Sequence, residues 1–359
     1  MRYSRVFIER FGYELAPCVV TSAELEERLA PIYDSLHIQP GQLEHITGIR
    51  ERRYWEPGYT VTRGATAAAE KALTASPVPS EALEMLIYGG VCRQHFEPAT
   101  ACHVAGELQH AGYSIHPSAH VYDVGNACLG VINGMLDIAN RIELGHIRAG
   151  MVFSCETARD IVATTIARLN GAPDMEEFKA AIATLTGGSA AVAVILSDGS
   201  FGETGRHRLR GAVVETAPEH HNLCRWGVEA HPAGQAAGAE ASLREFASTD
   251  ARAVLEHGVA LGERTWDLFL REMEWQVADV DRTVCHQVGS AHRGVMLKRM
   301  GLEAAQDFIT YEYLGNTGTA GLPVAAALAH ERGFLQPGHR VGLLGIGSGL
   351  NCMMLGVDW

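Results

Sequence analysis

One cysteine of this 359-residue chain lies where a strand is expected to give way to a helix. Residues 118–124 read as an extended strand, a Gly-Asn-Ala turn follows, and residues 129–142 are apolar on every side, as in a buried helix. Cys128 then lies at the helix N-terminus, where free backbone N–H groups and the helix dipole favour a thiolate. A single cysteine is more often an inert core residue, so its interpretation as a nucleophile depends on the rest of the chain.

Two polar residues in the second half of the chain could act together with such a thiol. His286 ends an apolar strand, and Asn316 lies in a Gly-rich turn at 315–318. Each has an ordinary structural explanation, since a histidine at a strand end is often a core residue and asparagine tolerates the conformation of turns. Cys128, His286 and Asn316 together supply a nucleophile, an imidazole and an amide donor, the set used in acyl transfer through a thioester.

A glutamate and a Gly-rich turn could complete this chemistry. Glu97 lies between Phe96 and Pro98 in a loop after a buried strand, and apolar surroundings raise a carboxyl pKa towards that of a general base. A surface glutamate is the simpler interpretation. The turn at 345–349 is too close to the C-terminus to open a dinucleotide-binding βαβ unit. It is better suited to place a backbone N–H against a carbonyl oxygen, as in an oxyanion hole.

A third group of polar residues lies near the N-terminus. Arg50, Arg52 and Arg53 follow a glycine and precede two aromatic residues, Tyr54 and Trp55. Guanidinium and aromatic groups in this arrangement could bind an anionic ligand with a planar head group, such as a nucleotide. A solvated loop with the same composition is the more common case.

The elements that must position these residues alternate between strand and helix. Up to about residue 197 the strands are almost continuously apolar, which is typical of a sheet covered on both faces. Residues 199–245 lack clear periodicity and predict strand pieces and a cap or lid. The β/α scheme then returns without a residue-level repeat. We therefore expect an N-terminal half, 1–197, that carries the cysteine, and a C-terminal half, 198–359, that carries the histidine and the asparagine.

The composition excludes several classes of protein. The chain is 47% apolar and 20% charged, as in ordinary globular proteins, and no apolar run is long enough to span a membrane. Its eight cysteines form no C-x-x-C pair, so neither a metal site nor a disulfide framework is expected, and we expect a soluble, cytoplasmic protein. The net charge of −13 argues against nucleic acid as the main partner.

In order and spacing, these motifs resemble the thiolase superfamily, and specifically its β-ketoacyl synthase III branch. The resemblance covers almost the whole chain and includes Thr-Gly-Ile-Arg at 47–50, Asn-Ala-Cys-Leu-Gly at 126–130, His-Gln at 286–287, Gly-Asn-Thr-Gly at 315–318 and Gly-Ile-Gly-Ser-Gly at 345–349. Within the branch, Phe-Glu-Pro-Ala-Thr at 96–100 and residues 344–352 are most similar to the OleA-type enzymes of olefin biosynthesis. Those enzymes join two acyl-CoA thioesters head to head into a β-keto acid.

The resemblance implies an α/β fold of five layers, αβαβα, built from two duplicated halves, and a homodimer. It implies that Cys128 is the acylated nucleophile, and that His286 and Asn316 hold the thioester oxygen of the second substrate. The backbone N–H groups of Cys128 and Ser348 would form a second oxyanion hole. In OleA-type enzymes the glutamate that matches Glu97 enters the neighbouring subunit's site and removes the α-proton of the second acyl group. CoA would be part of the substrate, and no separate cofactor is implied.

One departure from the family pattern concerns CoA. Ordinary members of this branch hold the CoA head group with a tryptophan and an arginine just before Thr-Gly-Ile-Arg, where this chain has Gln42 and Ile46. CoA binding must therefore differ in detail, and Arg50, Arg52 and Arg53 are the candidates for binding its phosphates.

Three other functions fit parts of the pattern. A decarboxylative 3-oxoacyl-ACP synthase III would use acyl-CoA and malonyl-ACP, which would make acyl carrier protein a partner. A Cys-His-Asn hydrolase or simple acyl transferase would release an acid or ester without forming a C–C bond. A non-catalytic subunit of a heterodimeric synthase is disfavoured, because Cys128, His286 and Asn316 are all present.

Overall fold

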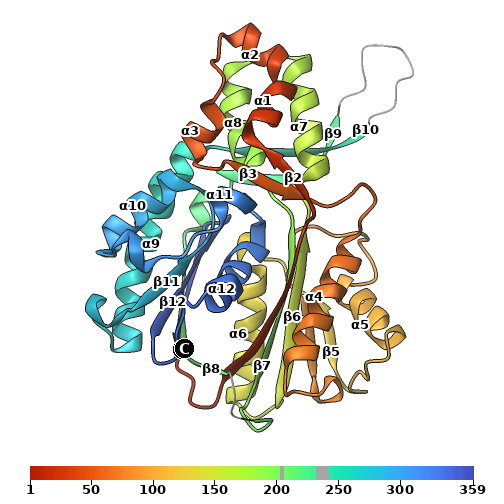
Figure 1. The fold of residues 1–359 in the computed structure, drawn as a ribbon, viewed down its shortest axis with the longest axis vertical. Helices are drawn as coiled ribbons and strands as arrows, with labels where there is room; N and C mark the ends of the chain where they lie inside the picture. The colour runs from red at the N-terminus through yellow and green to blue at the C-terminus, as the bar shows by residue number, and fades with distance from the viewer. Residues whose placement is uncertain (203–205, 232–241) are drawn as a thin grey trace.

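The computed structural model, which describes residues 1–202, 206–231 and 242–359, is built around a mixed sheet of nine strands (Figure 1). These strands are β1 (Phe7–Leu15), β4 (Met85–Tyr88), β5 (His120–Asp123), β6 (Ala149–Glu156), β7 (Ala190–Ser197), β8 (His207–Thr216), β11 (Arg282–Cys285), β12 (Arg340–Gly347) and β13 (Asn351–Asp358). Their order across the sheet is β11-β12-β13-β8-β1-β7-β6-β4-β5. The first half of the chain therefore forms one side of the sheet and the second half the other.

The two sides of the sheet meet over a short contact. β1 pairs with β7 along most of its length, but with β8 only at Phe7 and Ile8. Each side ends in parallel strands, β6-β4-β5 in the first half and β12-β11 in the second. The carboxyl ends of parallel strands meet at one edge of a sheet, and loops from such edges are a common place for functional side chains.

Helices cover the outer faces of both sides and fill the space between them (Figure 1). Beside the first half lie α4 (Val61–Ala75) and α5 (Thr100–His110), and beside the second half lie α9 (Ala251–Met273) and α10 (Ser290–Met300). The central layer contains α6 (Gly130–Glu143) and α12 (Gly321–Glu331). The predicted five-layered αβαβα fold is confirmed.

The burial of these elements explains the layers. Every residue of β6 and β7 is buried, as expected for strands with helices on both faces. Val192 and Val194 of β7 face the central core, whereas Ala193 and Ile195 pack with the residues of α4 and α5. Residues 321–329 of α12 are all buried, which accounts for a helix that is apolar on every side.

A smaller group of elements lies above the layers (Figure 1). It consists of α1 (Ser22–Arg28), α2 (Ala30–Leu36), α3 (Gln42–Thr47), α7 (Arg159–Gly171) and α8 (Met175–Leu185), the paired strands β2 (Cys18–Thr21) and β3 (Glu51–Tyr54), and the hairpin of β9 (Cys224–His231) and β10 (Ser242–Thr249). The short helix α11 (Tyr311–Leu314) packs against β3. Most of this group packs around its own apolar cluster, which includes Leu25, Tyr33 and Phe178.

The segment 199–245, predicted as strand pieces and a cap or lid, is divided between the main sheet and the upper group of elements. β8 pairs with β13 along its length and is a strand of the main sheet, not part of a cap. The hairpin β9-β10 instead packs against α7 and α8 in the upper group. Residues 203–205 and 232–241 of this segment lie outside the described residues.

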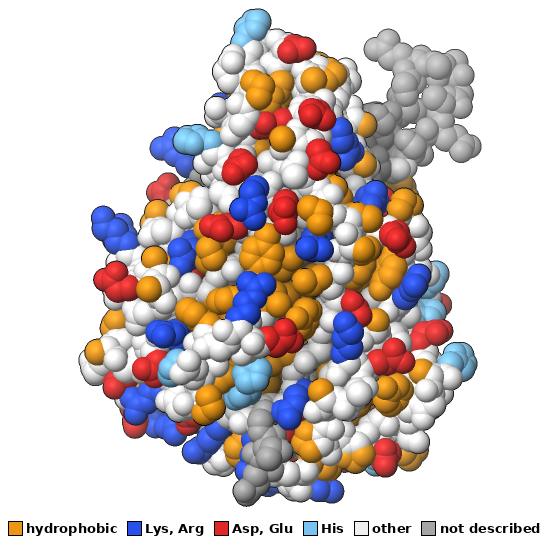
Figure 2. Space-filling view, viewed as in Figure 1, with side chains coloured by type: hydrophobic (Ala, Val, Ile, Leu, Met, Phe, Trp, Pro, Cys, Tyr) orange, Lys and Arg blue, Asp and Glu red, His pale blue; other side chains and the backbone are white. Residues whose placement is uncertain are grey.

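Figure 2 shows how hydrophobic and charged side chains are distributed over one face of the molecule. Hydrophobic side chains gather over the middle of this face, where Figure 1 draws α12, and charges of both signs are interspersed around them. No described helix is both long and apolar enough to cross a membrane.

Candidate active site

Cys128 lies in a tight turn between β5 and α6, in the place the sequence predicts. The turn is a short 3-10 helix (Ala127–Leu129), and Ala127 has a φ of 44°, a left-handed conformation that costs energy for a residue with a side chain. Gly130 allows the turn to lie against the end of β4, because a Cβ there would be 2.1 Å from the Gly89 carbonyl oxygen. The Val131 N–H, in the first turn of α6, donates a hydrogen bond to Thr319 Oγ1 at 2.8 Å.

The nucleophile turn is held to the C-terminal glycine turn by both packing and hydrogen bonds. A Cβ on Gly347 would lie 3.4 Å from the Cys128 nitrogen, so the two backbones are close. Asn351 Nδ2 donates to Asn126 Oδ1 at 2.9 Å, and Asn126 Nδ2 donates to Asn133 Oδ1 at 3.0 Å. These amides fix the glycine turn against the backbone N–H of Cys128, as an oxyanion hole made by two backbone segments requires.

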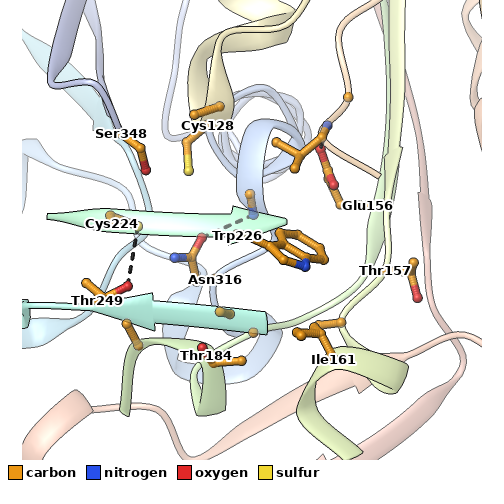
Figure 3. Close-up of a pocket in the computed structure, with 18 of the residues that line it drawn as sticks. Cys128, Glu156, Thr157, Ile161, Thr184, Cys224, Trp226, Thr249, Asn316 and Ser348 are labelled. Atoms are coloured by element: carbon orange, nitrogen blue, oxygen red, sulfur yellow. Dashed lines mark hydrogen bonds between the residues drawn. The ribbon is translucent and has the colours of Figure 1, made fainter. Parts of the chain in front are cut away.

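Cys128 lines a cavity of about 560 Å³ that both halves of the chain enclose (Figure 3). In Figure 3 the side chains of Cys128, Ser348 and Asn316 point into the same space, and β9 crosses it with Cys224 and Trp226. The volume and the mainly apolar lining suit a small organic ligand or part of a larger one. The labelled lining residues are Cys128, Glu156, Thr157, Ile161, Thr184, Cys224, Trp226, Thr249, Asn316 and Ser348.

Asn316 presents its amide to this cavity in a fixed orientation. Its Oδ1 accepts the Gly318 N–H at 3.1 Å, which leaves the Nδ2 group to act as the donor. Its backbone bridges to the first half, because Asn316 N–H donates to the Thr186 carbonyl at 2.9 Å and its own carbonyl accepts Gly188 N–H at 2.8 Å. The asparagine is therefore held in place independently of any ligand.

His286 follows β11 and is buried, and its backbone N–H donates to the Leu344 carbonyl at 2.9 Å. Burial, with a smaller contribution from His292, lowers its pKa to about 4, so the ring is neutral at pH 7 and keeps one N–H donor. His286 does not line the 560 Å³ cavity; it borders a small cavity of about 30 Å³ together with Cys285 and His292. The structure thus brings Cys128, Asn316 and Ser348 to one cavity and leaves His286 outside its lining.

Two buried side chains that the sequence analysis did not single out position the histidine loop. Asp307 accepts hydrogen bonds from Cys285 N–H at 3.0 Å and from Arg293 Nε at 2.7 Å. Gln287 donates to the Cys285 carbonyl at 2.6 Å and accepts the Thr310 N–H at 2.8 Å. The only sequence signal for either was the His-Gln pair itself.

The protonation of Cys128 differs from the sequence-based expectation. The dry surroundings raise its pKa to about 12, with smaller contributions from Cys224 and Glu156. Desolvation of a charged sulfur outweighs the favourable helix terminus, so the substrate-free protein holds a thiol and not a thiolate. The proton must leave in the course of the reaction with substrate.

This pKa leads to a testable pH dependence. Because only the thiolate is alkylated, reaction of Cys128 with iodoacetamide is expected to accelerate about tenfold per pH unit between pH 8 and 10. Peptide mass spectrometry at timed intervals measures the rate, with the exposed Cys102 as the reference for reagent access. A rate that is already maximal at pH 8 would contradict the raised pKa.

Glu97 does not line the cavity that holds Cys128 of its own chain. Residues 93–98 form an exposed loop, and the side chain of Phe96 is fully exposed. Both ends of this loop are fixed: Glu156 accepts the Val91 N–H, and Asp123 at the end of β5 accepts the Thr100 N–H at 2.9 Å. The structure of one chain therefore places Glu97 at the surface.

The three arginines near residue 50 have different environments, and one expectation was wrong. Arg52 is 1% exposed and donates to Ser22 Oγ at 3.0 Å, so it holds β3 to α1 and cannot bind a CoA phosphate. Burial also lowers its pKa. Arg53 is half-buried and donates to the Ala16 carbonyl at 3.5 Å. Arg50, just before β3, is exposed.

The cap or lid predicted within residues 199–245 corresponds at the cavity to the hairpin β9-β10, whose individual contacts the sequence analysis did not predict. Thr249 Oγ1 donates to Cys224 Sγ at 3.3 Å, and Trp226 Nε1 donates to Glu245 Oε1 at 2.7 Å, which fixes the indole. The irregular pattern of residues 199–245 gave no signal for these contacts. Glu156 was also missed, although a carboxylate as the last residue of a fully buried strand is an unusual feature.

Comparison with known proteins agrees with this geometry. Residues 270–359 match the family model "3-Oxoacyl-[acyl-carrier-protein (ACP)] synthase III C terminal". The acyl-CoA:acyl-CoA alkyltransferase of Shewanella oneidensis is 51% identical over 361 residues, and that of Xanthomonas campestris is 34% identical over 361 residues, with 100% of each chain covered in both cases.

Solved structures of Xanthomonas campestris OleA are similar over the whole fold. A variant with its cysteine changed to alanine superposes with a TM-score of 0.90 at 34% identity, covering 100% of this chain and 98% of that one. A cysteine-to-serine variant with bound lauric acid and lauroyl-CoA superposes with a TM-score of 0.88 at 33% identity, covering 99% and 100%. With a cysteine, an asparagine and a glycine turn from two duplicated halves around one cavity, the chain belongs to the acyl-CoA:acyl-CoA alkyltransferase (OleA) family of the thiolase fold.

Proposed function

We propose that this protein condenses two acyl-CoA molecules into a β-ketoacyl product, through an acyl group held on Cys128. The observation that carries the proposal is that Cys128, Asn316 and Ser348, which come from both halves of the chain, line one cavity. A thiol alone would not support it. A thiol beside a fixed amide donor and a glycine turn is the arrangement that acyl transfer needs.

In the first step, the Cys128 sulfur attacks the thioester carbonyl of one acyl-CoA. The oxygen becomes negatively charged and is held by the backbone N–H groups of Cys128 and Ser348. When the carbonyl re-forms, the C–S bond to CoA breaks, and the thiol proton passes overall to the departing CoA thiolate. The product of this step is an acyl-cysteine and free CoA.

In the second step, the α-carbon of another acyl-CoA attacks the acyl-cysteine. Loss of an α-proton creates an enolate, whose oxygen accepts a hydrogen bond from the Asn316 amide. The neutral His286 ring is proposed as the second donor, which requires the second acyl-CoA to reach beyond the 560 Å³ cavity. A new C–C bond forms, the Cys128 thiolate leaves, and a β-ketoacyl-CoA results. Its hydrolysis gives the β-keto acid and the second CoA.

The base for this step is proposed to be Glu97 of a second copy of the chain. Glu97 and Phe96 are exposed next to β5, which is an edge strand of the sheet and leads directly into the Cys128 turn. An unpaired edge strand is a natural place for a second copy to add. A homodimer formed along β5 would bring the loop of one subunit to the site of the other. Arg50, exposed near the upper group, is the remaining candidate among the arginines for a CoA phosphate.

The test of this function is condensation without malonyl groups. Purified protein with lauroyl-CoA alone is expected to release two CoA per molecule of β-keto acid formed, an acid that keeps all the carbons of both lauroyl groups. A thiol assay measures the CoA, and mass spectrometry identifies the product. The match of residues 270–359 to 3-oxoacyl-ACP synthase III favours a second candidate, the decarboxylative reaction with malonyl-ACP. Product that forms only after malonyl-ACP is added would support that candidate and contradict the proposal.

A further inference from the structure

The carboxylate of Glu156 lies between parts of the site that come from distant segments of the chain. It follows the apolar residues of β6, is 4% exposed and lines the cavity that contains Cys128. A Cβ on Gly318 would lie 3.3 Å from its Cγ, so the carboxylate packs on the turn that begins at Asn316. A buried carboxylate must be compensated by hydrogen bonds, and those of Glu156 identify its partner segment.

That partner segment is the start of the loop that carries Glu97. Glu156 Oε1 accepts the Val91 N–H at 2.9 Å, and Oε2 accepts the Cys92 N–H at 3.3 Å. Thr157 N–H donates to Cys92 Sγ at 3.4 Å, which adds a third contact. The two oxygens of one carboxylate therefore fix the direction in which the chain leaves β4.

The contacts in the middle of this loop are at its surface: Thr62 Oγ1 donates to Gln94 Oε1 at 3.3 Å, and the ring of His95 lies 5.1 Å from that of His103. Residues 93–98 are exposed, and Asp123 holds only the far end, through the N–H groups of Thr100 and Ala101 at 2.9 Å each. Arg93 Nε lies 3.9 Å from Asp123, a weak contact for an exposed pair. The path of the loop between these ends, and with it the place of Glu97, depends on how its first residues are held.

We propose that Glu156 is a positioning residue that orients the Glu97 loop of its own chain and thereby acts on condensation at the partner subunit's Cys128. The inference rests on the proposed function, in which Glu97 serves the second copy. Holding the N–H groups of Val91 and Cys92 at the same time requires a carboxylate at residue 156, because two N–H donors need two acceptor oxygens. In Glu156→Gln one acceptor becomes an NH₂ group that faces an N–H donor, so one of the two hydrogen bonds is lost.

Heterodimers test on which subunit Glu156 acts. Subunits with different affinity tags are co-expressed, one carrying Cys128→Ala and the other Glu97→Gln, so that one composite site remains, with Glu97 from the first chain and Cys128 from the second. Glu156→Gln added to the Cys128→Ala chain is expected to lower condensation of lauroyl-CoA about tenfold. The same change in the Glu97→Gln chain is expected to lower condensation clearly less than this, because Glu156 there borders the cavity of Cys128 but holds no functional Glu97.

Control variants make each outcome decisive. The control variant Glu256→Gln changes an exposed glutamate of α9 and is introduced into each of the two chains in turn. It should change neither the rate of acylation nor the rate of condensation. Glu156→Asp keeps both oxygens on a shorter side chain and should restore part of the lost condensation. It also replaces Glu156→Gln if that chain fails to fold.

Three results would contradict the inference in distinguishable ways. A larger loss when Glu156→Gln is in the chain that supplies Cys128 would show that Glu156 serves its own cavity. An equal loss in both positions would show a general structural role. A parent heterodimer with no condensation activity would contradict the role of Glu97 in the partner site, and therefore the proposed function itself.

Discussion

Protein with Cys128→Ala is expected to release CoA from lauroyl-CoA at least about 1000-fold more slowly than the wild type, because the acyl group has no sulfur to which it can transfer. The cavity, Asn316 and the glycine turn would remain, so binding of lauroyl-CoA should persist while turnover is lost. The measurements are CoA release by a thiol reagent and the affinity for lauroyl-CoA by calorimetry.

The location of the acyl group is tested on the wild type. After brief exposure to lauroyl-CoA, peptide mapping should place the added acyl mass on the peptide with Cys128 and not on the peptide with Cys224, the other thiol of the cavity. Cys102→Ala, which removes an exposed thiol, should behave as the wild type. CoA release by Cys128→Ala at the wild-type rate, or an adduct on Cys224, would contradict the assignment of the nucleophile.

Glu97→Gln is expected to separate the two steps of the reaction. Acylation of Cys128 should proceed at the wild-type rate, because attack of the sulfur on the thioester needs no removal of an α-proton. Condensation should fall about 100-fold or more, because an amide cannot accept the α-proton. A burst of one CoA per Cys128, followed by very slow further release and little β-keto product, is the expected time course.

The control for this variant is again Glu256→Gln, which should show full turnover. Glu97→Asp keeps the carboxylate on a shorter side chain and should give an intermediate rate of condensation. Wild-type condensation by Glu97→Gln would remove Glu97 from the reaction and would leave the source of the enolate to be sought elsewhere, with decarboxylation of a malonyl group as the first alternative.

The order of motifs along the chain was enough to predict the fold and to bring Cys128 and Asn316 into one site. The reason is physical, since each residue lies shortly before a helix with a strong apolar pattern: α6 follows Cys128, and α12, with nine buried residues, follows Asn316. Such patterns determine the layers, and the layers determine which loops meet.

Two kinds of feature could not be predicted. One is which side chains of a short strand face inward, and the other is a contact between residues that are far apart in the sequence. β3 has only four residues, and the tertiary packing that buries Arg52 and Tyr54, and not Glu51 and Arg53, decides which of its side chains point inward. Glu156 contacts residues 64 and 65 positions earlier in the chain, which no local pattern reveals. The raised pKa of Cys128 likewise arises from tertiary closure, whereas the helix terminus is a local feature.

The short pairing between the two sides of the sheet has a consequence for how the site comes into being during synthesis. Cys128 leaves the ribosome long before Asn316 and Ser348, and the first half can pair only with itself until β8 and then β13 are made. Domains that form from N- to C-terminus fold as their segments emerge, and contacts between distant segments come last. A nascent chain that stops before β12 would thus carry the cysteine and most of the cavity lining but lack Ser348 and the glycine turn. The oxyanion hole proposed for acyl transfer would form only when synthesis is almost finished.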